Sequence, residues 1–165
     1  MPNSDTDHLW GVVFIDHPEP AATPRLEAIL QILARHTASQ LIVSPCPEKF
    51  LSFNASVLAP RRPNQGDLGY WLNVWQDTPA PAMLLLNLNQ PDERLAARLA
   101  AGHGKYKILA STDANGHPRP VPAYYNRASM GAGLRLWRQG VRELAVLLKV
   151  LNAAALSAAP QTLCV

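Results

Sequence analysis

The sequence predicts a single three-layer α/β domain with a mostly parallel central sheet, of the Rossmann-like or flavodoxin-like kind. Three features of its N-terminal part support this fold class. Leu9–Ile15 is a continuous apolar run, Leu26–Leu33 places apolar residues at helical spacing, and Leu41–Val43 is a second apolar run. Strands without polar alternation are expected where helices cover both faces of a sheet, and that condition favours parallel pairing.

The connection after the first strand carries the signals of a helix start. Thr23 is suited to be the N-cap, Pro24 to be the first helical residue, and Glu27 places negative charge in the first turn. We expect this helix to end near residues 37–39, before the second strand begins.

The following segment predicts an edge strand and a second helix. Leu51–Val57 alternates apolar and polar residues, as a half-buried strand does, and residues 60–66 form a loop with two prolines. Asp67 can then cap a short helix whose apolar stripe packs against the sheet. The stripe consists of Leu68, Trp71, Leu72 and Trp75.

The second half of the chain continues the alternation of strand and helix. Ala82–Leu88 is a third buried strand, and Pro91–Glu93 opens a helix with acidic residues in its first turn. That helix is expected to end at Gly102–Gly104, where glycine favours a C-cap. Tyr106–Ala110 is a fourth strand.

A segment with proline at alternate positions comes next. Asp113–Gly116 is a turn signal, and His117–Tyr125 contains Pro118, Pro120 and Pro122. Because proline has no N–H group, a strand of this composition can pair on one side at most. We expect either an antiparallel edge strand or a polyproline stretch on the surface.

Residues 131–156 are expected to form one long C-terminal helix that is apolar over more than half of its circumference. Such a helix is normally covered from two directions, by the sheet and by a neighbouring helix or a second subunit. The predicted interface residues are Trp137, Val141, Leu144 and Leu148. The chain as a whole is divided into a flexible leader over residues 1–8, one α/β domain over 9–156 and a tail over 157–165.

Composition limits the classes of function. With 48% hydrophobic and 16% charged residues, the chain can bury a sizeable core. A net charge of +3 does not indicate nucleic-acid binding, since such binders concentrate basic residues on one face. No secretory signal and no apolar run of about 20 residues is present, so we expect a cytoplasmic protein without membrane insertion. Cys46 and Cys164 form no metal or redox motif and are expected to be reduced thiols, although a disulfide between them stays open.

The carboxyl ends of the predicted strands are the candidate ligand positions, because ligands of open α/β sheets bind there. Asp16 and His17 follow the first strand and Asp113 follows the fourth. Asp16 and His17 point apart on an extended chain and cannot form an acid–base pair by themselves. Asp113 and His117 could approach one another across a turn, but the sequence identifies no further metal ligand, and neither His-x-x-x-His nor Cys-x-x-Cys occurs. There is also no nucleophile elbow, so we predict no catalytic set, no metal and no cofactor. The other strand-end positions are Ser44, Cys46, Asn87, Asn89, Ser111 and Thr112.

A glycine-containing loop before the last helix is the best signal for an anion site. Backbone N–H groups at such a helix start favour a phosphate, and Arg127 adds positive charge. The pattern departs from Gly-x-Gly-x-x-Gly, because Leu136 stands at the third glycine position. The alternative is a flexible helix entry capped by Ser129. The candidate ligand-binding residues here are Arg127, Ser129, Gly131 and Gly133.

Two functional hypotheses remain. The favoured one is a non-enzymatic interaction or scaffold protein that self-associates or docks on a protein partner through apolar helix faces. It rests on the low charge, the four tryptophans, the wide apolar face of the last helix and the lack of a catalytic set. The alternative is a small nucleotide- or phosphometabolite-binding enzyme or sensor. It would use the strand-end rim with Asp16, Asp113 and the Ser129–Gly133 loop.

Overall fold

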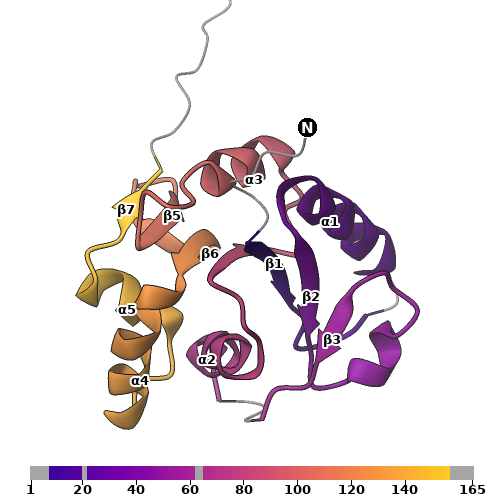
Figure 1. The fold of residues 1–165 in the computed structure, drawn as a ribbon, viewed down its shortest axis with the longest axis horizontal. Helices are drawn as coiled ribbons and strands as arrows, with labels where there is room; N and C mark the ends of the chain where they lie inside the picture. Colours follow the sequence, from indigo (N-terminus) through magenta and orange to yellow (C-terminus); the bar gives the residue numbers. More distant parts are fainter. Residues whose placement is uncertain (1–7, 20–21, 62–64, 157–165) are drawn as a thin grey trace, which may run out of the picture.

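A seven-stranded sheet forms the centre of the molecule, as seen in the computed structural model (Figure 1). The structure describes residues 8–19, 22–61 and 65–156, and the statements below concern these residues. The strand order is β3-β2-β1-β4-β6-β5-β7. The strands are β1 (Leu9–Phe14), β2 (Ser39–Val43), β3 (Ser56–Leu58), β4 (Ala82–Leu86), β5 (Ile108–Thr112), β6 (Pro118–Asn126) and β7 (Ala154–Ala155).

Helices cover both faces of the sheet, which confirms the predicted three-layer α/β architecture. In Figure 1, α1 and α3 lie on one side of the strands, and α2, α4 and α5 lie on the other. Two separate hydrophobic clusters fill the spaces between the layers. No helix within the described ranges has the length and apolarity needed to cross a membrane. The helices are α1 (Thr23–His36), α2 (Asp67–Asp77), α3 (Glu93–Ala100), α4 (Met130–Arg138) and α5 (Leu144–Val150), with short 3-10 turns η2 (Pro47–Phe50) and η3 (Arg127–Ser129).

The sheet is mostly parallel, as the continuous apolar runs predict. β1 pairs in parallel with β2 and with β4, β2 pairs in parallel with β3, and β5 pairs in parallel with β7. All five residues of β4 are buried. The strand predicted over Leu51–Val57 is shorter and later than expected, because residues 51–55 form turns and β3 begins at Ser56.

β6 is antiparallel, but the prediction that it lies at the edge of the sheet is wrong. It lies between β4 and β5 and pairs with both. The proline argument holds for its first half, since Pro118 and Arg119 pair with β5 alone. The second half has no proline, and Ala123–Asn126 pairs with β4 as well. Tyr124 and Tyr125 are consequently fully buried.

The prediction of one long C-terminal helix is also wrong. Gly140 adopts a φ of 91°, its N–H donates to Trp137 O at 3.0 Å, and Val141 N donates to Leu136 O at 3.0 Å. These two bonds form a Schellman motif that ends α4, and α5 starts only at Leu144. The predicted leader and tail fall largely on residues 1–7 and 157–165, outside the described residues, as does Cys164, so those boundaries stay predictions.

Two glycines allow α2 and α4 to approach closely, and each accommodates a tryptophan of the other helix. A Cβ on Gly133 of α4 would lie 2.5 Å from Trp71 Cζ3, and one on Gly69 of α2 would lie 3.1 Å from the ring of Trp137. Trp71 is fully buried. Packing therefore requires glycine at position 133, since any larger side chain would displace a core aromatic ring.

Replacing Gly133 by alanine is expected to lower the free energy of unfolding by about 1–3 kcal/mol, because the new methyl group overlaps the Trp71 ring. Equilibrium denaturation measures the change. Gly131→Ala is the matched control in the same helix, because its methyl group would meet only Arg135 Nη1, at 3.7 Å. Helix propensity should leave that variant unchanged or up to about 1 kcal/mol more stable. Equal losses in the two variants would contradict the packing explanation.

Candidate functional site

A cleft of about 360 Å³ lies at the carboxyl ends of β1 and β4. The chain proceeds from β1 to β2 on one side and reaches β4 on the other, so this is the point where the strand order reverses. In open α/β sheets, ligands bind in the crevice at such a point. The polar lining residues are Asp16, His17, Glu19, Arg25, Asp67, Asn87 and Asn89.

A second hollow of about 310 Å³ continues the first one toward the start of α2. The two share Phe14, Asp16, His17 and Asp67, and the second is completed by Gly66 and Tyr70. We call the two together the switch-point cleft. Its walls come from the β1–α1 connection, the start of α2 and the residues that follow β4.

The start of α1 presents positive charge to the cleft. Ala22, at the N-cap position, makes no side-chain capping bond, and Thr23, the predicted cap, is the first helical residue. Arg25 also lines the cleft, and its Nη1 donates to Asn89 Oδ1 at 2.9 Å. Asn87 Oδ1 in turn accepts the N–H of Asn89 at 2.9 Å. An uncapped helix N-terminus beside an arginine is suited to bind an anion.

Asp67 supplies a half-buried carboxyl group to the same cleft. Its Oδ1 accepts the N–H of Leu144 at 2.7 Å, and Leu68 N donates to Arg142 O at 3.2 Å, so the start of α2 is joined to the α4–α5 connection. Burial raises the pKa of Asp67, and the charge of Glu143 acts in the same direction, while backbone N–H groups oppose it. A carboxyl with a raised pKa in a cleft is a candidate functional group.

Tyr70 brings a buried hydroxyl group to the part of the cleft near α2, where Asp16 also lines the wall. The residue is 3% exposed, its ring meets that of Phe14 edge-on at 5.6 Å, and its Oη has no hydrogen-bond partner among the described residues. Burial, together with the carboxylate of Asp16, raises the pKa of Tyr70 well above its ordinary value. The hydroxyl therefore keeps its proton at neutral pH and can donate a hydrogen bond.

The structure brings only part of the predicted site together. Asp16 and His17 line the switch-point cleft, whereas Asp113 lies in the turn after β5, on the far side of β6 from β4. Its Oδ1 accepts the N–H groups of His117 at 2.9 Å and Asn115 at 2.8 Å, and these bonds lower the pKa of Asp113. Asp113 thus closes a turn within its own segment.

The predicted anion loop lies at the other end of the strands, beside the amino end of β4 and away from the switch-point cleft. β6 is antiparallel, and its last residue, Asn126, pairs with Ala82 at the start of β4. Ser129 is buried, and its hydroxyl donates to Asn126 O at 2.6 Å. Gly131 is exposed, and Gly133 packs against α2. These residues therefore do not share a site with Asp16.

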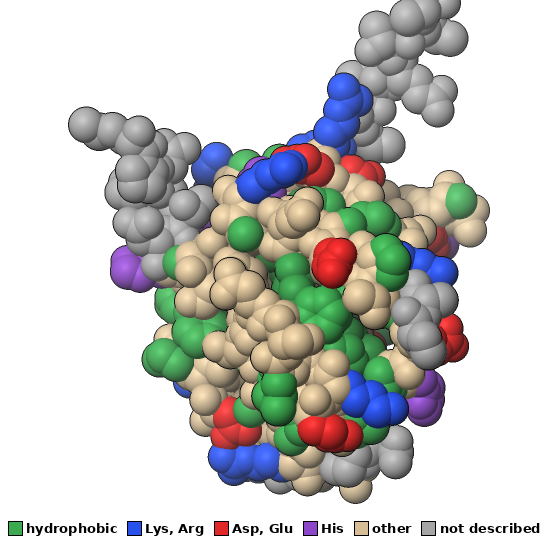
Figure 2. Space-filling view, turned by 90° about the vertical axis from the view of Figure 1, so that its right-hand side faces the viewer, with side chains coloured by type: hydrophobic (Ala, Val, Ile, Leu, Met, Phe, Trp, Pro, Cys, Tyr) green, Lys and Arg blue, Asp and Glu red, His purple; other side chains and the backbone are tan. Residues whose placement is uncertain are grey.

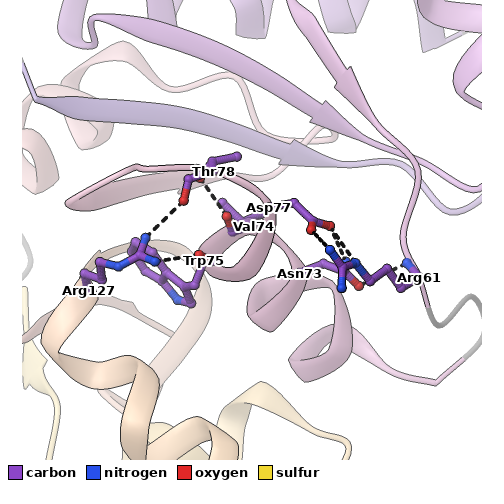
Figure 3. A network of polar contacts seen from close by, with 7 residues as sticks. All are labelled: Arg61, Asn73, Val74, Trp75, Asp77, Thr78 and Arg127. Atoms are coloured by element: carbon purple, nitrogen blue, oxygen red, sulfur yellow. Dashed lines mark hydrogen bonds and ion pairs between the residues drawn. The ribbon is translucent and has the colours of Figure 1, made fainter.

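Arg127 uses its donors inside the fold (Figure 3). Its Nη1 donates to Thr78 O at 3.1 Å, and its Nη2 donates to Trp75 O at 2.7 Å. Its Nη1 also donates to Ala80 O at 3.1 Å. These carbonyls lie in the last turn of α2 and just after it, where positive charge is favourable. Arg127 therefore stabilises the C-terminal end of α2 by binding its carbonyl oxygens.

The residues predicted to form an interface are largely used within the chain. Leu144 is fully buried and Leu148 is 3% exposed. Trp137 packs against Gly69, with the guanidinium of Arg142 at 3.8 Å from its ring centre. Of the four residues, Trp137 and Val141 are the ones that are half-exposed.

The face of the molecule in Figure 2 carries basic and acidic side chains mostly toward its rim, with hydrophobic side chains and an acidic one nearer the centre. Among the described side chains of that face, no extended field of one sign is seen. Nucleic-acid binders usually concentrate basic residues. Within the described ranges, no group of three or more His, Cys, Asp and Glu side chains could hold a metal ion.

Sequence reasoning missed three residues of the cleft as site residues. Arg25 directly follows Thr23 and Pro24, where the sequence predicts the start of a helix after the first strand. That position was the signal by which Arg25 could have been identified as a candidate. Asp67 was predicted only as a helix cap. Tyr70 has no signal in the sequence, because its missing hydrogen-bond partner is visible only in the packed structure.

No protein family and no curated protein matches this chain in sequence. Several solved structures share its fold. A protein of Aquifex aeolicus VF5 has a TM-score of 0.78 at 10% identity, over 92% of this chain and 87% of that chain. Molybdopterin-guanine dinucleotide biosynthesis protein A from Archaeoglobus fulgidus has 0.68 at 15%, over 89% and 82%. 2-C-Methyl-D-erythritol 4-phosphate cytidylyltransferase from Thermus thermophilus has 0.66 at 16%, over 90% and 88%.

These structures correct the favoured functional hypothesis. The sequence-based preference for a non-enzymatic interaction protein is contradicted, because the fold is shared with nucleotidyl transferase-like enzymes. At these identities the likeness shows the fold alone. It agrees better with the alternative of a nucleotide-binding enzyme, and the cleft at the carboxyl ends of β1 and β4 gives that alternative a place in the structure.

The raised pKa of Asp67 predicts a pH dependence of stability. Since the folded state holds this proton more tightly than the unfolded state, whose value is near 3.8, the contribution is complete below that value and is lost as the pH rises through the folded pKa. Asp67→Asn keeps an oxygen acceptor and has no proton to lose. Its free energy of unfolding relative to the wild type should increase between about pH 3 and pH 7, measured by urea denaturation.

Asp113→Asn is the control, and the opposite sign is expected. The folded pKa of Asp113 is lowered, so its stabilising contribution is present above the unfolded value and is lost as the pH falls through the folded pKa. The stability of Asp113→Asn relative to the wild type should therefore decrease over the same rise in pH. If the Asp67→Asn variant behaved in the same way, burial would not be the dominant effect at Asp67.

Proposed function

We propose that this chain is a nucleotide-binding enzyme whose substrate occupies the switch-point cleft. The observation that carries the proposal is the position of the cleft, between the carboxyl ends of β1 and β4 and beside the uncapped start of α1. The likeness of the fold to nucleotidyl transferase-like enzymes supports the same class of function. Transfer of a nucleotidyl group is the reaction type that we favour.

The phosphate groups are assigned to the start of α1. Backbone N–H groups there have no capping side chain, and the guanidinium of Arg25 lies at the same end of the helix. A phosphate at this position meets both the positive end of the helix dipole and a side-chain cation. Arg25 is already oriented by its bond to Asn89, so less side-chain freedom is lost on binding.

Acidic residues outnumber basic residues in the cleft, and this bears on the form of the substrate. Asp16, Glu19 and Asp67 line it, against Arg25 as its one arginine or lysine among the described residues. A nucleotide would therefore enter as its complex with a divalent ion such as Mg²⁺, which one or two carboxylates and the phosphates commonly hold together. Asp16 is the carboxylate that we assign to this contact, and the ion would neutralise phosphate charge.

The two-part shape of the cleft favours a nucleotide over a smaller phosphorylated metabolite. The part near α1 measures about 360 Å³ and the part near α2 about 310 Å³, and the two share four lining residues. With phosphates near α1, the nucleoside would extend toward Tyr70. The hydroxyl of Tyr70 there offers a hydrogen-bond donor.

Thermal unfolding in the presence of ATP, CTP, GTP or UTP with MgCl₂ tests the proposal. At a free concentration 100 times Kd, a bound nucleotide adds about 2.7 kcal/mol to the free energy of unfolding. For a domain of this size, that raises Tm by roughly 5–11 °C. The absence of any shift with all four nucleotides, with and without Mg²⁺, would overturn the proposal.

A pair of substitutions in α1 tests the assignment of the phosphates. Arg25→Gln should weaken nucleotide binding about ten-fold or more, because it removes a charged hydrogen-bond donor from the cleft. Arg35→Gln is the matched control at the other end of the helix, where Arg35 pairs with Glu93 at 2.6 Å. It should bind as the wild type does. Equal affinities in both variants would place the phosphates elsewhere.

A further inference from the structure

A second cavity, separate from the switch-point cleft, lies between α5 and the beginning of β6. It measures about 640 Å³ and shares no lining residue with the cleft. The two lie near each other along one strand, since Pro118 lines this cavity and Val121 lines the cleft. Three residues of extended strand span about 10 Å. We call it the α5 cavity.

The walls of the α5 cavity are mainly apolar. Pro118 of β6 and Ala145 and Leu148 of α5 form them, and Ala153 adds a further apolar surface after the helix. Cavities of this size with apolar walls and a few polar groups are typical of small-molecule sites. An apolar body of several carbon atoms would remove these walls from water.

Among the described residues, Lys149 is the cation that the rim of the cavity leaves unpaired. Lys149 is exposed and has no ion pair or hydrogen bond from its side chain to any described residue. His117 also lines the cavity, and its Nδ1 lies 3.5 Å from Asp113 Oδ2, a carboxylate outside the cavity lining. No aspartate or glutamate lines the cavity among the described residues. The rim therefore attracts a single negative charge.

The C-terminal end of α5 forms part of this rim. Asn152 adopts a φ of 50°, its N–H donates to Lys149 O at 3.2 Å, and Ala153 N donates to Leu148 O at 2.9 Å. These bonds form a second Schellman motif at the end of α5. Lys149 and Asn152, which take part in it, both line the cavity. The side-chain amide of Asn152 has no partner among the described residues and is free to donate to a ligand.

We propose that the α5 cavity binds an acyl carboxylate, a molecule with an apolar chain and one terminal carboxylate. The carboxylate pairs with Lys149 Nζ and accepts from the amide of Asn152. The chain packs on Pro118, Ala145 and Leu148. The site is independent of the proposed nucleotide site, because neither its residues nor its chemistry depend on the switch-point cleft.

Titration of the ¹⁵N-labelled full chain with octanoate, followed by amide chemical shifts, tests the proposal and reports where the probe binds. We expect saturable shifts at Lys149, Asn152 and Arg119, with Kd of about 1 mM or lower. 1-Octanol, which has the same chain and no charge, should bind at least about ten-fold more weakly. No saturable shift with octanoate at these amides, or equal binding of 1-octanol, would overturn the proposal.

Variants make the test specific. Lys149→Gln should weaken octanoate binding about ten-fold, whereas Lys105→Gln, an exposed lysine outside the cavity, should bind as the wild type does. Ala145→Phe fills the cavity and should abolish the shifts. Its amide spectrum reports whether it folds, and Lys149→Gln keeps the test decisive if it does not. Equal affinities of the two lysine variants would show that Lys149 does not hold the carboxylate.

Discussion

The burial of the central strands on both faces is the constraint on which the rest of the structure depends. Val12 and Val13 are neighbours in β1, each is fully buried, and each belongs to a different hydrophobic cluster. Because adjacent side chains of a strand point to opposite faces, both layers of helices are needed to cover β1. Polar loops can then leave the sheet only at the ends of its strands. The strand order reverses beside β1, and this reversal leaves a cleft at the carboxyl ends of β1 and β4.

The parts of the fold that follow from side-chain burial could be predicted from the sequence. The apolar runs of β1, β2 and β4 identify doubly covered strands without any knowledge of their partners. The position of β6 could not be predicted, because Pro118–Pro122 dominates its pattern while the four residues after it make the pairing with β4. The helix break at Gly140 could not be predicted, because apolar residues keep helical spacing on both sides of it. In the structure, two capping bonds at Gly140 and Val141 end the helix despite this spacing.

The only residues of the candidate site that could be predicted from the sequence are those whose position follows from the strand topology alone. Asp16 and His17 follow a central strand, and the general rule for strand ends is sufficient to place them. The loop from Ser129 to Gly133 does not lie at the predicted strand ends, because β6 is antiparallel and delivers the loop to the start of β4. Asp67 and Tyr70 gain their character from burial and from missing or distant partners, which no local pattern contains.

The bond between Asp67 and Leu144 spans 77 positions of the sequence. On the ribosome, β1, α1 and the start of α2 emerge well before α5, and β4 emerges before its partner β6. A nascent chain therefore exposes the acidic wall of the cleft while the backbone that fixes it has not yet been synthesised. The switch-point cleft is therefore completed late, so a ligand bound there could stabilise the finished protein but could not guide the early steps of its folding.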